Sequence, residues 1–110
     1  MTIATGGNPT LRRNRIHDGK SSGVYVLDGG LGTLEDNDIT GNASAGVAIN
    51  TGGNPTLRAN RINRNGSQAV RIYQGGRGVI ENNDLTGNEK GAWSIAEDCI
   101  ADATRARNKE

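Results

Sequence analysis

Aliphatic residues recur along the chain with a period of 23 residues, and rows of 23 align over residues 1–92 without insertion or deletion. Positions 1, 3, 11 and 16 of every row are aliphatic or Met. These residues are Met1, Ile3, Leu11, Ile16, Val24, Val26, Leu34, Ile39, Val47, Ile49, Leu57, Ile62, Val70, Ile72, Ile80 and Leu85. Alternation at positions 1 and 3 is typical of a β-strand, and a fixed repeat of this length indicates a solenoid.

Turn signals divide each row, which we call a coil. A Gly pair lies at positions 6 and 7, and a pair of Gly, Asn or Asp residues occurs within positions 18–20. Three short strands per coil, joined by turns, are therefore expected. One coil cannot bury its own aliphatic edge, but stacked coils can. The sequence predicts an all-β fold, a single-stranded parallel β-helix whose coils lie about 4.8 Å apart.

Polar positions repeat with the same period. Position 14 is always Asn, at Asn14, Asn37, Asn60 and Asn83, and we expect these side chains to stack and to bond to one another and to the backbone. Position 12 reads Arg12, Glu35, Arg58 and Glu81, and position 15 reads Arg15, Asp38, Arg61 and Asp84. Neighbouring coils thus place opposite charges above one another. Because each exposed pair is worth only about 0–1 kcal/mol, we expect its main effect to be on the pairing register.

The pattern ends after Ile95, which gives about four complete coils. Asp98 is suited to N-cap a short helix over residues 99–108, with Ile100, Ala103 and Ala106 turned toward the last coil. The expected organisation is a β-helix over residues 1–96 and a helical capping tail over residues 97–110. The first coil has no such cap. Two explanations are open: the chain is part of a larger protein, or a homodimer forms through the uncapped N-terminal coil.

Composition narrows the partners. The net charge is +1 and both signs are interleaved, which argues against a nucleic-acid or membrane-surface binder. No apolar run approaches the roughly 18 residues of a membrane span, and the N-terminal residues do not resemble a signal peptide. The single cysteine, Cys99, allows no internal disulfide. A reducing compartment fits, so the cytoplasm is slightly favoured.

The segments LRRNRIHDG, LEDNDITGN, LRANRINRN and IENNDLTGN each follow a Gly pair and a Pro or Gly. They resemble the repeats of right-handed parallel β-helices in the pectate-lyase-like superfamily, and more narrowly the repeats of carbohydrate-binding and sugar-hydrolase modules. The resemblance covers residues 1 to about 96. Right-handedness comes from this resemblance and from the crossover rule. The resemblance also implies strands at positions 1–4, 11–13 and 15–17 of each coil, which form the first, second and third sheets. It implies further that ligands bind on the outer face of the first sheet.

The side chains at positions 2 and 4 of each coil form that outer face. The binding candidates on it and in the adjoining turn are Tyr25, Asp28, Asn50, Arg71, Tyr73 and Gln74. Tyr25 and Tyr73 are the only tyrosines and are suited to stack on a sugar ring, although β-propensity alone also favours Tyr in a strand. Arg71 favours an acidic sugar or another carboxylate. A polysaccharide and a protein both remain candidate ligands.

Catalytic features are absent from the pattern. Asp28 and Arg71 lie two coils apart, and no second carboxylate on the face completes an acid–base pair. We therefore assign no catalytic residue, no metal ligand and no cofactor, and the residues argue against an enzyme without excluding one. Three functions stay open: a non-catalytic recognition module, an oligomerisation scaffold acting through exposed coil ends, and a fragment of a polysaccharide lyase, hydrolase or epimerase.

Overall fold

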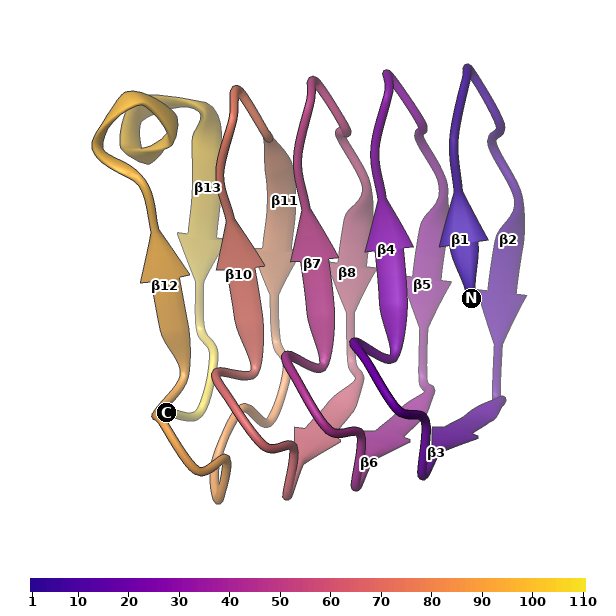
Figure 1. Ribbon diagram of the computed structural model, residues 1–110, viewed down its shortest axis with the longest axis vertical. Coiled ribbons are helices and arrows are strands. Elements are labelled where there is room, and N and C mark those ends of the chain that lie inside the picture. Colours follow the sequence, from indigo (N-terminus) through magenta and orange to yellow (C-terminus); the bar gives the residue numbers. More distant parts are fainter.

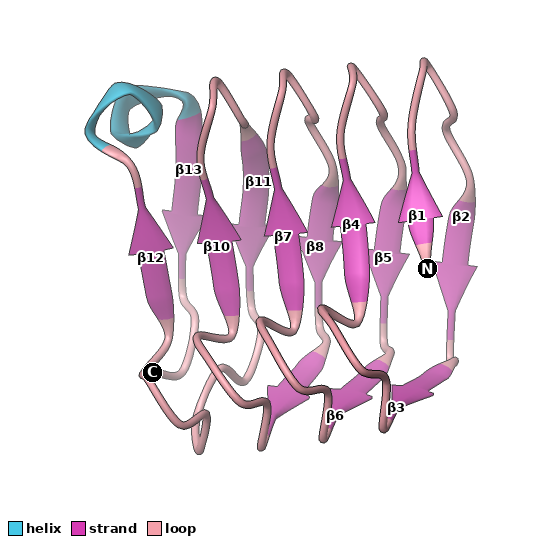
Figure 2. Ribbon diagram, viewed as in Figure 1, coloured by secondary structure: helices cyan, strands magenta, loops and turns pink.

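The computed structural model describes residues 1–110 as a solenoid of parallel strands in three sheets (Figure 1). The first sheet contains β1 (Thr2–Ile3), β4 (Val24–Val26), β7 (Val47–Ile49), β10 (Val70–Ile72) and β12 (Trp93–Ile95). The second contains β2 (Thr10–Arg12), β5 (Thr33–Glu35), β8 (Thr56–Arg58), β11 (Gly78–Glu81) and β13 (Ala103–Ala106). The third contains β3 (Arg15–His17), β6 (Asp38–Thr40) and β9 (Arg61–Asn63). The helix η1 (Glu97–Asp102) is a 3-10 helix, and turns join the strands (Figure 2).

Neighbouring coils pair in the register that the repeat predicts. Thr2 pairs with Tyr25, and Tyr25 with Ala48, each 23 residues further along the chain. The second and third sheets keep the same offset up to β11 and β9. The predicted parallel β-solenoid is therefore confirmed, and each strand of a coil lies directly above its equivalent in the next.

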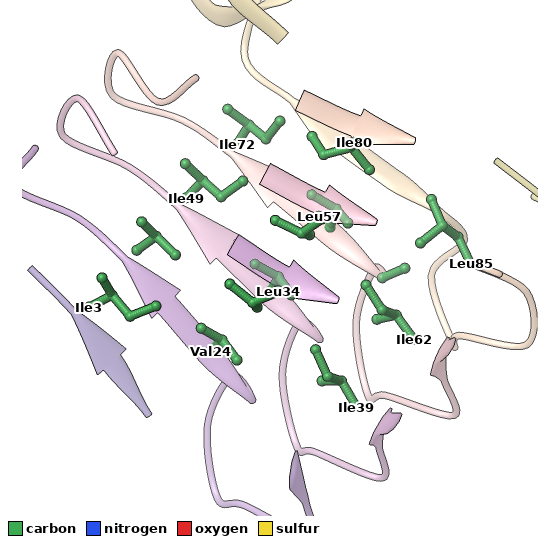
Figure 3. Packing of buried hydrophobic residues seen from close by; sticks show 14 of the residues in the cluster. Ile3, Val24, Leu34, Ile39, Ile49, Leu57, Ile62, Ile72, Ile80 and Leu85 are labelled. Carbon is green, nitrogen blue, oxygen red and sulfur yellow. The ribbon is translucent and has the colours of Figure 1, made fainter. Parts of the chain in front are cut away.

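The aliphatic positions fill the interior of the solenoid (Figure 3). The side chains with no exposed surface include Leu34, Ile39, Ile49, Leu57, Ile62, Ile72 and Ile80. Burial of one such side chain contributes about 1.5–3 kcal/mol, opposed by the entropy of ordering the chain. In the first coil Leu11 and Ile16 are only partly buried, and Met1 is 53% exposed. The core is thus complete in the middle coils and open at the N-terminal end.

The predicted asparagine stack is present. Asn60 donates from its backbone N and from Nδ2 to Asn83 Oδ1, at 2.9 and 3.0 Å, and Nδ2 also donates to the Leu34 carbonyl at 2.8 Å. Asn37 and Asn83 repeat this pattern, and Asn108 extends it into the fifth coil. These bonds satisfy amides that would otherwise be costly to bury.

A second asparagine stack lies at position 19, where the sequence indicated only a turn. Asn42 donates from N and Nδ2 to Asn65 Oδ1, and Asn65 donates in the same way to Asn88 Oδ1. Gly19 takes the place of Asn in the first coil and donates its backbone N–H to Asn42 Oδ1 at 3.1 Å. Two hydrogen-bonded columns therefore hold the two corners of each coil that flank the third sheet.

The stacked charges are only partly paired. Glu35 lies 3.3 Å from Arg12 and 3.6 Å from Arg58, so position 12 forms a continuous series over three coils. At position 15, Arg61 contacts Asp38 and also reaches Asp36 at 2.9 Å. These two carboxylates, Asp38 foremost, raise the pKa of Arg61. Arg15 forms no salt bridge, and no salt bridge joins the third and fourth coils at these positions. The predicted pairing is therefore complete only between the second and third coils.

The C-terminal segment differs from the predicted helix over residues 99–108. Only a short 3-10 helix forms, and β13 then pairs with β11, with Arg105 opposite Ile80. A fifth coil is therefore present, which contains two more residues than the others before Asn108 rejoins the asparagine stack. The helix prediction placed Ile100 against the coil end, whereas its side chain is 50% exposed.

Three residues close the C-terminal end of the core. Arg105 occupies the aliphatic position 11 of the fifth coil, and its guanidinium lies 5.2 Å from the centre of the Trp93 ring. Cys99, from η1, is fully buried within the hydrophobic cluster, and this burial raises the pKa of its thiol. A cation on an aromatic face can cover apolar surface while keeping its charge in water.

Candidate functional site

The first sheet presents the predicted binding residues on its outer face. One column runs through Thr2, Tyr25, Ala48, Arg71 and Ser94, which pair in register across β1, β4, β7, β10 and β12. Their side chains face outward because the aliphatic neighbours at positions 1 and 3 face the core. Asn50 and Tyr73 follow β7 and β10 directly. The chain therefore carries these candidates on consecutive coils of one face.

Arg71, Tyr73 and Asn50 form one connected cluster. The Arg71 guanidinium lies 4.6 Å from the centre of the Tyr73 ring, a cation–π distance. Asn50 Nδ2 donates to the Tyr73 hydroxyl at 3.2 Å, and Thr51 Oγ1 donates to Asn50 Oδ1 at 2.8 Å. Asn50 is only 8% exposed. Its amide therefore holds Tyr73 in place, while Arg71 and the Tyr73 ring form the accessible part of the cluster.

Tyr25 lies in the same column as Arg71, with Ala48 between them. Its hydroxyl is 2.5 Å from Ser21 Oγ. Hydrogen bonds with Ser21 and then Ser22 lower the pKa of Tyr25, and the positive charge of Arg71 acts in the same direction. Ala48 is 2% exposed, so its small side chain is covered between two large ones. Two half-buried phenol rings and one guanidinium thus share a short stretch of sheet.

Asp28 and Gln74 lie at the edge of this face, in the turns after β4 and β10. Both residues are exposed and have left-handed backbone, with φ of 50° and 49°. Thr51, with φ of 47°, occupies the same turn position in the coil between them. Asp28 forms no salt bridge with Arg71 or with any other cation. The turn column therefore adds polar groups to the edge of the face without an acid–base pair.

The family comparison fits this geometry. The model of the family described as "Right handed beta helix region" matches residues 1–105, nearly the whole chain. The chain belongs to the right-handed beta helix family. Searches of curated proteins and of solved structures found no match. The match extends past the predicted boundary at residue 96 and into β13, in agreement with the fifth coil of the structure.

The two hollows on the surface of this right-handed beta helix are lined by no residue of the first sheet. One, of about 340 Å³, is lined by Arg15, His17, Asp18, Thr40, Gly41 and Arg64 beside the third sheet. The other, of about 280 Å³, is formed by residues between Arg105 and Glu110. The face with Tyr25 and Tyr73 is therefore a platform rather than a cleft.

No group of three or more His, Cys, Asp or Glu side chains is arranged to hold a metal ion. His17 bonds through Nδ1 to Asp18 Oδ2 at 2.8 Å, and the two are not part of a larger group of His, Cys, Asp or Glu side chains. None of the helices has the length and apolar character that crossing a membrane requires.

Sequence reasoning about this right-handed beta helix missed the residues that orient the tyrosines. Ser21 and Thr51 were not among the candidates, yet Ser21 bonds to Tyr25 and Thr51 bonds to Asn50. Ser21 precedes Tyr25 by four residues, across a turn whose path the repeat does not specify. Thr51 carries a usable signal, because it lies at the same repeat position as Asp28 and Gln74.

Proposed function

We propose that this right-handed beta helix is a non-catalytic recognition module, part of a larger protein, that binds a saccharide along the outer face of its first sheet. The observation that carries the proposal is the shared column of Tyr25 and Arg71, with Tyr73 held beside Arg71 by Asn50. A flat platform suits an extended chain of sugar rings, which lies along a surface rather than entering a pocket.

Each group has a chemical part in such binding. The phenol rings offer apolar faces to the C–H faces of a pyranose ring, and their hydroxyls are already fixed by Ser21 and Asn50. Fixed side chains lose less conformational entropy on binding. Arg71 supplies donors for a carboxylate or sulfate group. Asp28 and Gln74 can bond to sugar hydroxyls at the edge of the platform. The expected ligand is therefore an acidic polysaccharide.

The test is retention on immobilised polysaccharides, with neutral and acidic members at equal loading. We expect retention on an acidic member and its loss in the double variant Tyr25→Ala, Tyr73→Ala. Arg71→Gln should weaken binding to acidic members by about tenfold, the loss of one charge-assisted hydrogen-bond pair. Arg64→Gln is the matched control, because Arg64 lines the hollow beside the third sheet and should leave retention unchanged.

Three results would contradict the proposal. Retention by the double Tyr variant would show that the ligand binds elsewhere. Absence of retention on every polysaccharide would shift the proposal to a protein ligand on the same face. New reducing or unsaturated sugar ends during the assay would indicate a lyase or hydrolase, and Asp28 and Arg71 would then be the first residues to change. Circular dichroism of each variant separates lost binding from lost folding.

A further inference from the structure

The N-terminal end of the solenoid has unpaired strands and a partly exposed core. Strands β1, β2 and β3 are the end strands of their sheets, so one side of each has no partner strand. Leu11 and Ile16 are partly exposed, whereas their equivalents in the second coil, Leu34 and Ile39, are fully buried. Unpaired strands above an exposed core form a surface on which a further strand can be added.

The asparagine stack is also open at this end. In the middle coils, each Asn Oδ1 accepts two hydrogen bonds from the preceding coil, as Asn37 Oδ1 does from Asn14 N and Nδ2. Asn14 Oδ1 accepts none. The first coil therefore offers two acceptor sites to an asparagine stacked in the same register. The free Asn14 Oδ1 therefore favours a segment with Asn at position 14, whereas unpaired strand edges would accept any strand.

The charges on the same surface are unbalanced. Arg58 and Arg61 belong to a middle coil and contact Glu35 and Asp38 of the coil before. Arg12 and Arg58 each pair with Glu35 alone, but the Arg12 side chain is 62% exposed against 45% for Arg58, and Arg15 forms no salt bridge at all. An acidic coil placed before the first would give Arg12 and Arg15 the same type of neighbour that Arg58 and Arg61 already have.

A second copy of this chain offers no end coil with acids at positions 12 and 15. Its N-terminal end carries Arg12, Arg13 and Arg15, and its fifth coil, whose acids lie in other segments, has Ala106 and Lys109 at the equivalent positions. Stacking of copies in either orientation would bring cations against cations. The C-terminal end is closed as well by Arg105 on the Trp93 ring. The charge disfavours a homodimer through the uncapped first coil, and the closed C-terminal end disfavours head-to-tail stacking of copies.

We propose that the N-terminal end of this solenoid is a docking surface for one acidic β-helical coil, with Glu or Asp at positions 12 and 15 and Asn at position 14. This coil has the chemistry of residues 24–46 of the chain itself. The proposal concerns a different surface from the tyrosine platform and does not depend on ligand binding there.

The repeat itself supplies the test. A copy of residues 24–46 is added before Met1 of the full chain, which places the copied acids above Arg12 and Arg15. The matched control is the same extension with Arg at the copied positions of Glu35 and Asp38. Both extensions bury the same aliphatic side chains and differ only in charge. Thermal unfolding is followed for both at low and at high ionic strength.

We expect the acidic extension to unfold about 4–8 °C above the Arg-bearing one at low salt. The gap should shrink at 1 M salt, where the screening length falls to about 3 Å. The recipient variant Arg12→Glu, Arg15→Asp should reverse the order of the two extensions. Reversal requires contact between the charges of the extension and those of the first coil, so a general effect of net charge would not produce it.

Equal melting temperatures at low salt would overturn the proposal. So would rapid amide hydrogen exchange throughout the acidic extension, since a docked coil protects its amides. Sedimentation of the unextended chain tests the alternative occupant. A concentration-dependent dimer that the acidic extension abolishes would show that a second copy covers this end. A monomer, together with the expected order of melting temperatures, would support docking of an acidic coil.

Discussion

Individual asparagine and glycine residues decide how closely the coils of this protein can stack. Position 14 and the aliphatic positions could be predicted from the sequence because they recur without exception. The stack at Asn42, Asn65 and Asn88 could not, because the first coil has Gly19 there and the segment also fits a turn. Backbone conformation shows the relationship instead. The residue before each of these asparagines has left-handed φ: 67° at Gly41, 54° at Arg64 and 74° at Gly87.

Asn60→Ala should lower the free energy of unfolding by about 2–4 kcal/mol. It removes the buried bond from Asn60 Nδ2 to the Leu34 carbonyl, and it takes away the oxygen that accepts from the backbone N and the Nδ2 of Asn37. Asn14→Ala is the matched change at the open end, where the side chain is exposed, and should cost less than about 1 kcal/mol. Urea unfolding of both variants measures the difference, and equal losses would show that burial of the stack does not matter.

Substitutions at two glycines, Gly87 and Gly53, distinguish the cost of backbone strain from the cost of a steric clash between coils. Gly87 has φ of 74°, and a Cβ at this residue would meet no atom within 4 Å, so Gly87→Ala should cost about 1–2 kcal/mol through strain alone. At Gly53 a Cβ would lie 2.4 Å from the Val26 carbonyl oxygen of the preceding coil. Gly53→Ala must push two coils apart and should cost more, about 3 kcal/mol or above. A smaller loss at Gly53 than at Gly87, by chemical denaturation, would contradict this view of the coil spacing.

At the scale of elements, the third sheet ends at the coil in which the carboxylate at position 15 forms a turn instead of an ion pair. Asp84 lies opposite Arg61 in the repeat, yet Asp84 Oδ1 accepts hydrogen bonds from Thr86 Oγ1 at 2.6 Å and Thr86 N at 3.1 Å. The expected ion pair is therefore replaced by a local turn. A charge alternation identifies which residues face each other, but a nearby hydroxyl can capture the carboxylate first.

The Asp84 turn predicts a pH dependence. The Thr86 hydroxyl, followed by the Thr86 N–H, lowers the pKa of Asp84 below its ordinary value of 3.8. Because the folded state holds the ionised form, this stabilisation is present above pH 3.8 and is lost as the pH falls through the lower folded pKa. Asp84→Asn should reduce the loss of stability between about pH 5 and pH 3, as followed by urea unfolding. An unchanged pH profile would contradict this assignment.

The C-terminal element shows why its prediction from sequence was wrong. Ile100, Ala103 and Ala106 have helical spacing, and Asp98 is a plausible N-cap. The fifth coil was hidden because η1 lengthens its first turn and because Arg105, rather than an aliphatic residue, occupies position 11. A repeat search cannot recognise a coil in which both the spacing and the core residue change.

On the scale of the whole molecule, five coils make a body about as long as it is wide, with extents of 27 × 26 × 26 Å. The two end surfaces are therefore a large part of the total surface. They differ in character, because the core is open at Leu11 and Ile16 and closed by Arg105 and Trp93 at the other end. The tyrosine platform, by contrast, could be placed from sequence because it depends only on strand alternation.

Arg105→Leu should make the C-terminal end of the solenoid prone to self-association. The change restores the aliphatic residue that the other coils have at position 11 and removes the cation from the Trp93 ring. We expect concentration-dependent association in sedimentation velocity, since exposed apolar surface beside unpaired strands favours it. Arg105→Gln is the control, because it removes the charge without adding apolar surface and should remain at the mass of the parent protein. Association of both variants would point to charge loss alone.

The alternation of charge between coils also makes an even change in the number of coils different from an odd one. Coils one and three share the sequence GGNPTLR-NRI, 46 residues apart, while the coil between them carries acids at the same positions. Gain or loss of a single internal coil would set like charges face to face at one junction, whereas gain or loss of a pair would leave every junction matched. Such a solenoid can therefore change its length by duplication most easily in steps of two, and the pair of coils, rather than the single 23-residue repeat, is its unit of growth.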